Sequence, residues 1–108
     1  MTAATDGGAL GGLRVLELAT MLSAPMAGML LADHGADVIK IELPGGGDPF
    51  RMVGQKKGAA SLSWKFLARN KRLITLDVRE PGGREVFLKL VAEADGLIEN
   101  FRPGTLER

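Results

Sequence analysis

Two arginines, Arg79 and Arg102, are the side chains in this sequence best suited to bind an anion. Each follows a short apolar run that predicts a buried strand, Leu73–Leu76 and Leu97–Ile98. A guanidinium holds several donors in one plane and can pair with a phosphate through two hydrogen bonds at once. The two arginines therefore fit a site for a phosphorylated ligand. Solvated surface charge explains the same residues equally well.

A second candidate is the stretch Asn100-Phe101-Arg102-Pro103-Gly104, which combines an amide, an aromatic ring, a guanidinium and a proline-fixed turn. The ring and the guanidinium can both stack on flat π systems, so the stretch suits a planar base that carries a phosphate. A tight turn with Phe101 packed into the core is the other interpretation.

Residues that could catalyse a reaction do not form a familiar pattern. The chain has no cysteine, and a single histidine, His34, cannot build a histidine metal cluster. Five carboxylates lie near the ends of predicted elements, namely Asp33, Asp37, Glu42, Asp48 and Glu99. None is paired with a base or a second acid at a telling spacing. We therefore predict a binding segment that contains no catalytic residue and no metal ligand.

The composition limits the classes of partner. The chain has 108 residues, of which 45% are apolar and 25% charged, as in one small globular domain. A net charge of +1 does not indicate nucleic acid binding, and no apolar run approaches the roughly 20 residues that span a bilayer. Residues 1–12 lack the pattern of a signal peptide. They predict a flexible N-terminal tail and a cytoplasmic protein.

The elements that position these residues begin with a strand, a helix and a strand over Leu13–Glu42. The apolar run Leu13–Leu18 and the β-branched run Asp37–Glu42 are of strand length. Between them, Pro25 suits the first turn of a helix that continues through His34, and Gly35 can adopt the left-handed conformation that ends it. Strands joined in this way lie parallel, with a right-handed crossover.

The remaining chain continues the alternation of strands and helices. A long loop over residues 43–58 contains Gly45-Gly46-Gly47, which is a weak match to a phosphate-binding loop because its spacing and its place after the second strand differ from the usual motifs. Ser61 predicts the cap of a short helix. A third strand at Leu73–Leu76, an amphipathic helix from Pro81 and a fourth strand at Leu97–Ile98 follow.

Four strands that alternate with helices predict an α/β fold: a Rossmann-like parallel sheet with the strand order 3-2-1-4. The loops after the strands then share one edge, where Arg79 and Arg102 both lie. Thr105 and the residues after it resemble the start of another helix. We therefore expect the chain to be the N-terminal part of a larger domain in a longer protein; a frayed natural terminus is the alternative.

Several of these segments together resemble the N-terminal part of the family III coenzyme A transferases, the formyl-CoA transferase and carnitine CoA-transferase group. The matching segments are Gly12–Leu18, Pro25, Leu31–Glu42, Gly47-Asp48, Asn70–Arg72, Leu76-Asp77 and Glu99–Gly104. They occur in the order and spacing of the family, over nearly all of Leu10–Arg108.

The resemblance implies a function and an assembly. Family members are much longer and form interlocked homodimers, so residues 13–108 correspond to the N-terminal part of the large, CoA-binding domain. The enzymes move coenzyme A between an acyl-CoA thioester and a carboxylic acid through an enzyme-aspartyl intermediate. The nucleophilic aspartate lies beyond residue 108, which implies that the segment alone is inactive.

The resemblance also implies which residues contact the substrate. Family CoA contacts match Leu76, Arg79, Asn100, Phe101 and Arg102, and the acyl-site loop matches Met21, Leu22 and Ser23. Formyl-CoA transferases have a glutamine at the position of Leu22. Because leucine cannot hydrogen-bond an oxalate-like carboxylate, a more apolar acyl group is favoured.

Two other functions fit the same residues. The α-methylacyl-CoA racemases share the fold and the opening motifs, but they move a proton beside the thioester with an acid–base pair. The intact Asn100–Gly104 stretch favours the transferase over the racemase. A non-catalytic CoA-binding or dimerisation fragment is the third alternative. The acyl donor and the acceptor acid are open at this point.

Overall fold

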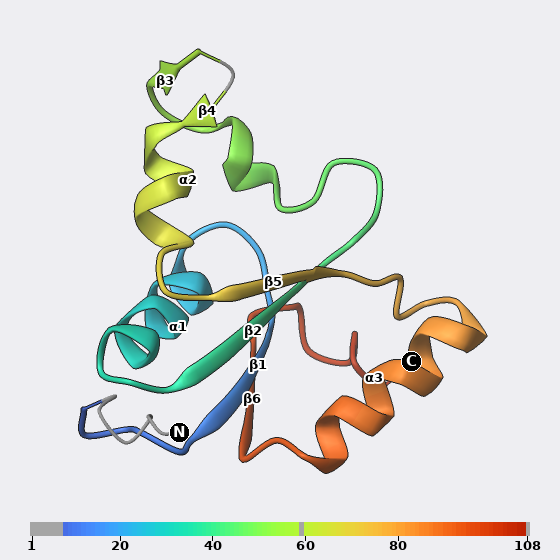
Figure 1. The fold of residues 1–108 in the computed structure, drawn as a ribbon. Helices are drawn as coiled ribbons and strands as arrows, with labels where there is room; N and C mark the ends of the chain where they lie inside the picture. Colours follow the sequence, from blue (N-terminus) through green and yellow to red (C-terminus); the bar gives the residue numbers. More distant parts are fainter. Residues whose placement is uncertain (1–7, 59, 108) are drawn as a thin grey trace.

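A computed structural model describes residues 8–58 and 60–107 of the chain (Figure 1). In chain order the elements are β1 (Arg14–Leu18), α1 (Ser23–Asp33), β2 (Asp37–Glu42), the 3₁₀ helix η1 (Pro49–Met52), β3 (Lys56–Lys57), β4 (Ala60–Ser61), α2 (Leu62–Leu67), β5 (Arg72–Thr75), α3 (Pro81–Ala92) and β6 (Gly96–Glu99). None of the helices in this described part has the length and hydropathy that a bilayer-spanning segment needs.

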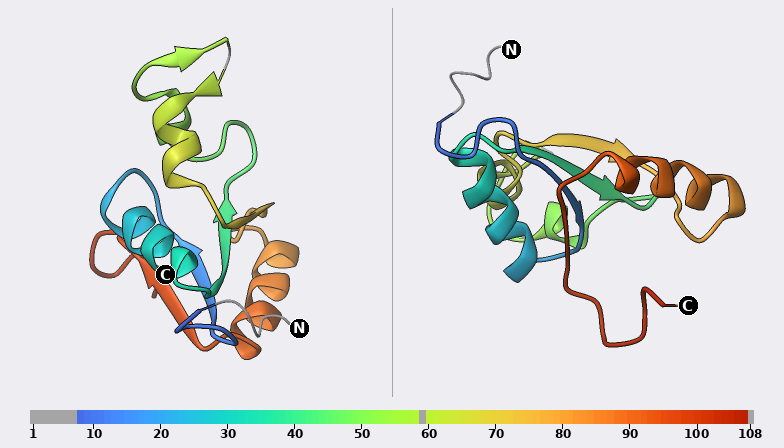
Figure 2. Two further views of the ribbon diagram at one scale, coloured as in Figure 1. Left: turned by 60° about the vertical axis from the view of Figure 1, so that its left-hand side comes forward. Right: turned by 90° about the horizontal axis from the view of Figure 1, so that it is seen from below.

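The main sheet has four parallel strands in the order β5-β2-β1-β6. The four strands predicted from the sequence correspond to β1, β2, β5 and β6, so the predicted order 3-2-1-4 and the Rossmann-like α/β class are confirmed. Leu16 in the centre pairs with Ile39 on one side and Leu97 on the other. Helices α1 and α3 lie on opposite sides of the sheet (Figure 2).

The two central strands are buried on both faces because side chains alternate across a strand. On the face toward α1, Val15 and Val38 pack with Ala32 and Ala36 into an apolar core. The same face continues into buried charged residues near the carboxyl edge of the sheet. The alternate apolar side chains of β1 and β2 lie on the opposite face, the side on which Figure 2 shows α3, and no residue of α3 is buried.

Helices α1 and α2 begin at or near the residues that the sequence predicts. Helix α1 begins at Ser23 and has Pro25 in its first turn; Gly35, at φ +105°, follows its end. The Ser61 hydroxyl caps α2 by accepting a hydrogen bond from the Trp64 N–H at 3.1 Å. Beyond Pro103 the described chain forms turns, so the helix expected from Thr105 is not present there.

The long loop of residues 43–58 is more structured than the sequence suggests. Asp48 caps η1 by accepting from the Phe50 N–H, with Pro49 in the first turn. Strands β3 and β4 form a short antiparallel hairpin that extends away from the main sheet with α2 (Figure 1). The expected N-terminal tail lies partly outside the described residues; within them, residues 8–12 form turns, and the Leu10 N–H donates to the His34 carbonyl at 2.9 Å.

Candidate functional site

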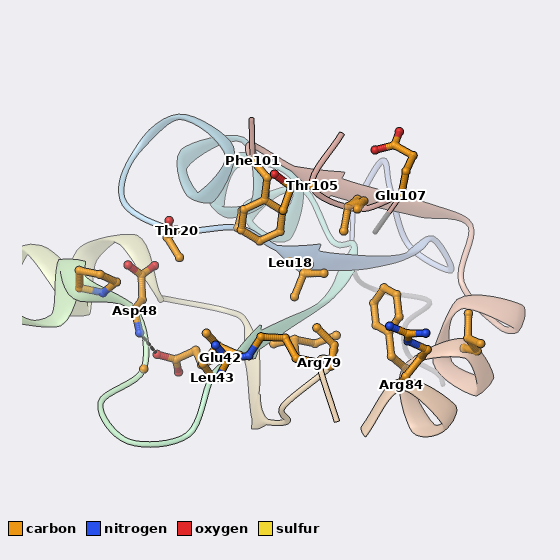
Figure 3. Close-up of a pocket in the computed structure, with 18 residues that line it drawn as sticks. Leu18, Thr20, Glu42, Leu43, Asp48, Arg79, Arg84, Phe101, Thr105 and Glu107 are labelled. Carbon is orange, nitrogen blue, oxygen red and sulfur yellow. Dashed lines mark hydrogen bonds between the residues drawn. The ribbon is translucent and has the colours of Figure 1, made fainter. Parts of the chain in front are cut away.

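A cavity of about 840 Å³ opens at the carboxyl edge of the sheet, on the side of α3 (Figure 3). The strand ends Leu18 and Ile41 form its floor, and Phe87 and Leu88 of α3 contribute further apolar surface. Open α/β sheets bind ligands at this edge, beside the point where the strand order reverses. The volume is within the range of small-molecule sites.

The structure brings two of the expected contact residues to this cavity. Arg79 and Phe101 line it, and in Figure 3 they stand on either side of Leu18. Arg102 is exposed and does not line the cavity, although it follows Phe101 directly. Leu76 does not line it either, and its N–H donates to the Glu42 carbonyl at 2.9 Å.

Sequence reasoning missed the contribution of α3. Arg84, Phe87 and Leu88 line the cavity, and Arg84 adds a second guanidinium to that of Arg79. The available signal is the apolar stripe of the predicted helix, which includes Phe87. An apolar stripe alone predicts a surface for packing and does not distinguish it from the wall of a cavity.

Arg79 is held in place by its neighbour Asp77. The guanidinium makes two contacts with the carboxylate, Nε to Oδ1 at 2.9 Å and Nη2 to Oδ2 at 3.1 Å. The hydrogen bond from Arg79 holds the pKa of Asp77 below its ordinary value, and the carboxylate raises the pKa of Arg79. The arginine is therefore oriented at the cavity before any ligand arrives.

The expected acyl-site loop crosses the carboxyl edge between β1 and α1. Asn100 holds it through Thr20, whose N–H donates to Oδ1 at 3.2 Å and whose carbonyl accepts from Nδ2 at 2.8 Å. A longer contact of 3.3 Å joins Nδ2 to the Ser23 hydroxyl. Met21 and Leu22 are both exposed, and Met21 has a φ of +66°, which is rare for a residue other than glycine. Met21, Leu22 and Ser23 do not line the cavity, but the adjacent Thr20 does.

Four charged side chains are buried beneath this loop; Glu17 and Lys40 lie on the sheet face toward α1, and Lys71 and Asp48 reach them from other segments. Lys40 Nζ lies 2.7 Å from Glu17 Oε2 and 2.9 Å from Asp48 Oδ2. Lys71 Nζ lies 2.6 Å from Glu17 Oε1. Oε1 of Glu17 and Oδ2 of Asp48 are met by these ion pairs rather than by aligned hydrogen bonds. We call Glu17, Lys40, Asp48 and Lys71 the buried tetrad; its formal charge is zero.

Burial and neighbouring charges shift the pKa of Lys71 in the tetrad and of Glu42 beside it. Burial lowers the pKa of Lys71, while Glu17 opposes that change. Burial alone would raise the pKa of Glu42, but hydrogen bonds from Arg51 and from the backbone N–H of Asp48 hold it below its ordinary value. The Arg51 guanidinium also lies 4.2 Å from the centre of the Trp64 ring. The backbone of Asp48 is thus fixed by Glu42 (dashed line in Figure 3).

We expect Gly28→Ala to destabilise the protein through the buried tetrad. A Cβ at Gly28, in α1, would overlap Glu17 Oε1, whose side chain is fully buried and paired on both oxygens. Overpacking of this kind costs about 1–3 kcal/mol, which exceeds the roughly 1 kcal/mol that alanine gains over glycine in a helix. Urea denaturation measures the difference.

Gly46→Ala is the matched control, since a Cβ there meets no atom within 4 Å and the residue has no positive φ. Its unfolding midpoint should equal that of the parent protein. A Gly28→Ala variant at least as stable as the parent would show that the Glu17 side chain can move aside, contrary to its tight fit against α1.

The comparisons with known proteins agree with the fold. Over 99 residues the chain is 52% identical to a succinyl-CoA–D-citramalate CoA-transferase of Chloroflexus aurantiacus, covering 91% of this chain and 25% of that protein. It is 46% identical over 101 residues to a formyl-CoA:oxalate CoA-transferase of Afipia carboxidovorans, covering 93% of this chain and 24% of that protein. The chain spans about a quarter of the length of these relatives.

A solved structure is similar over the same region. The crystal structure of a CAIB/BAIF family protein from Brucella suis superimposes with a TM-score of 0.84 at 43% identity, covering 94% of this chain and 28% of that one. Residues 10–108 match the family described as CoA-transferase family III. The resemblance drawn from the sequence is therefore confirmed, and the chain belongs to CoA-transferase family III.

Proposed function

We propose that the protein moves coenzyme A between an acyl-CoA thioester and a carboxylic acid, and that this chain supplies the CoA-binding edge. The observation that carries the proposal is the cavity at the carboxyl edge of the sheet, in a chain whose relatives are named as CoA-transferases. Membership of the family supports the general reaction. The cavity and the cations beside it support the part that this chain plays.

The chemistry of the cavity matches that of coenzyme A. The carrier has a planar adenine, several phosphates and a long flexible arm. Arg79 and Arg84 offer positive charge for phosphates, and the Phe101 ring offers a flat apolar surface. Of the remaining expected contacts, we assign Leu76 and Arg102 to the rim of the same site, and Asn100 to the loop beside it, which it holds through Thr20.

The acyl group belongs at the loop that contains Met21, Leu22 and Ser23. Both Met21 and Leu22 expose apolar side chains beside Thr20, which lines the cavity. Leu22 offers no hydrogen bond to a second carboxylate, so we expect the acyl group to meet this loop through an apolar surface.

The proposed reaction uses a nucleophilic aspartate that we expect beyond residue 108. In the proposed sequence an aspartate carboxylate attacks the thioester carbonyl, the C–S bond breaks, and a mixed anhydride and a CoA thiolate form. The thiolate attacks the aspartyl carbonyl of the anhydride and displaces the donor acid, which leaves an aspartyl-CoA thioester. The acceptor carboxylate then attacks the aspartyl-CoA thioester, which releases the CoA thiolate and forms a second anhydride. The thiolate attacks the acceptor carbonyl of this anhydride, which gives the acceptor-CoA thioester and the free aspartate. We further propose that the intact protein is an interlocked homodimer.

An exchange assay tests the proposal. The intact protein should transfer CoA from a donor thioester to a free acid, and an acceptor acid labelled with oxygen-18 in its carboxylate should pass one labelled oxygen to an enzyme carboxylate. Deuterium entering the α-carbon of an acyl-CoA without any acceptor acid would instead identify a racemase. Absence of exchange across a panel of acids would reject the proposed reaction.

Arg79→Met should weaken binding of coenzyme A about tenfold. A charge-assisted contact with a phosphate contributes roughly 1.5 kcal/mol or more, and salt screens it because the side chain is exposed. Calorimetric titration of CoA at low salt measures the loss, which should shrink as salt is added.

Arg72→Met is the control for Arg79→Met. Arg72 makes the same kind of twofold contact with an aspartate, Asp37, at 2.9 and 2.7 Å, but at the amino edge of the sheet. Its replacement should leave CoA affinity within a factor of two. Equal losses in the two variants would mean that Arg79 acts only through the general charge of the protein.

A further inference from the structure

The buried tetrad requires an explanation beyond stability. Taking charges out of water is costly, and replacing buried ion pairs with apolar residues is often neutral or stabilising. All four side chains of the tetrad are nevertheless at most 1% exposed. The apolar core of the same sheet face, which includes Val15 and Val38, ends where the tetrad begins. The position of the charges therefore points to a role other than stability.

The tetrad is attached to the acyl-site loop and to the start of α1 at three points. Lys40 Nζ donates to the Ala19 carbonyl at 3.0 Å, Asp48 Oδ1 accepts from the Met21 N–H at 3.0 Å, and Lys71 Nζ donates to the Pro25 carbonyl at 2.8 Å. The first two of these backbone groups lie in the loop, and the third lies in the first turn of α1, which follows it. Asn100 holds the same loop from the side of β6.

The attachment from Asp48 is made to Met21, whose backbone conformation is unfavourable. Met21 is one of two residues other than glycine with a positive φ in the described part of the chain. Such a conformation costs free energy and persists when its surroundings impose it. The Met21 N–H is held by Asp48 Oδ1, while Asp48 Oδ2 is held by Lys40. The carboxylate thus links the strained residue to the buried charges.

The loop joins the two faces of the sheet. Glu17, Lys40 and Lys71 lie on the face toward α1, whereas Ala19 and Thr20 line the cavity on the face toward α3. Asp48 also lines the cavity, and Figure 3 shows Asp48 and Thr20 at the same end of it. The hydrogen bonds between the tetrad and the loop therefore hold Ala19 and Thr20 in place at the cavity.

We propose that the buried tetrad is a positioning device for the acyl-site loop, and that Asp48 is its positioning residue because it holds Met21 in the left-handed conformation. This inference rests on the proposed function for its effect on catalysis, but not for its effect on the loop. Asp48 does not react; it acts through the backbone of Met21. The expected consequence is that loss of Asp48 lowers kcat for exchange and leaves binding of coenzyme A largely intact.

Asp48→Asn is the first test variant. The amide has one acceptor oxygen, which can face either Lys40 or the Met21 N–H, whereas the carboxylate serves both. We expect amide hydrogen exchange of a peptide that contains Thr20 and Met21 to rise at least tenfold, with exchange in α3 unchanged. We expect kcat to fall at least tenfold, with KM for acyl-CoA within a factor of two.

A double-mutant cycle with Met21→Gly separates positioning from general stability. Glycine adopts a positive φ without strain, so Asp48 has less to impose in that background. Asp48→Asn should then lower kcat threefold or less when measured against Met21→Gly alone. The same loss of kcat in both backgrounds would overturn the proposal.

Two further arms keep the test decisive. If Asp48→Asn does not fold, Asp48→Glu retains the charge balance of the tetrad while displacing the carboxylate, and it should show the same loop exchange and kcat changes. Asp37→Asn, at the amino edge, is the matched control and should alter neither. Unchanged loop exchange in the Asp48 variants would overturn the positioning role. Absence of CoA exchange in the parent protein would reject the proposed function alone, since the loop measurement needs no activity.

Discussion

Lys40→Met is expected to lower the free energy of unfolding by about 3–5 kcal/mol, because it leaves buried carboxylates without their shared cation. Lys40 Nζ serves Glu17, Asp48 and the Ala19 carbonyl at once, and its side chain is 1% exposed. The methionine fills the volume but carries no charge, so the tetrad is left with one net negative charge. Chemical denaturation of the intact protein measures the change.

Lys89→Met is the matched control for this variant. Lys89 pairs with Glu85 at 3.6 Å on the surface of α3, where both side chains are more than 70% exposed. Exposed helix pairs contribute little to stability, so its unfolding midpoint should stay the same. Similar losses in the two lysine variants would mean that the buried position of Lys40 adds nothing to the stability of the protein.

Restoring the charge balance should make the second substitution less damaging in the Lys40→Met background than in the parent protein. The double variant Lys40→Met, Glu17→Gln leaves Asp48 and Lys71, one negative and one positive charge. Residues in one network are energetically coupled, so the double variant should be more stable than the sum of the two single losses predicts. Additive losses would mean that Lys40 and Glu17 contribute independently.

The sheet could be predicted from sequence because its signals are local and strong. Leu13–Leu18 and Asp37–Glu42 are apolar enough to predict strands by themselves, and Pro25 and Gly35 mark the helix between them. Parallel order and crossover hand then follow from general rules of chain connection. The confirmed order β5-β2-β1-β6 is the one expected for a Rossmann-like sheet.

The buried tetrad could not be predicted in the same way. Glu17 and Lys40 each interrupt a strand run, and sequence alone does not reveal that they pair across β1 and β2. Lys71 precedes β5, so its position in the sheet favours the opposite edge. Its side chain instead reaches Glu17 beneath α1. Asp48 is one carboxylate in a glycine-rich loop whose course has no sequence pattern.

The cavity was predicted in outline only. The rule that loops after parallel strands share an edge predicts Arg79 and Arg102 there, and of these two only Arg79 lines the cavity, together with Phe101. The wall formed by α3 depends on how far that helix stands from the sheet, which no residue pattern specifies. Arg102 illustrates the same limit, because one position along a turn decides whether a side chain faces the cavity.

Asn100→Ala is expected to lower kcat/KM for CoA exchange about a hundredfold. The Asn100 amide makes two hydrogen bonds with the Thr20 backbone, at 3.2 and 2.8 Å, and a third with the Ser23 hydroxyl. It therefore holds the cavity side of the loop, opposite the tetrad. A displacement of about 1 Å at a reacting group can cost a factor near one hundred. Steady-state exchange kinetics measure the loss.

Ser23→Ala is the control for Asn100→Ala. It removes only the longest of the three hydrogen bonds of Asn100, at 3.3 Å, and should lower kcat/KM threefold or less. If Asn100 acts as a clamp, its replacement lowers kcat, because the acyl group is misplaced while coenzyme A still binds through Arg79 and Phe101. A rise in KM for acyl-CoA at unchanged kcat would show instead that the Asn100 amide contacts the carrier itself, and that the loop keeps its position by means of the tetrad alone.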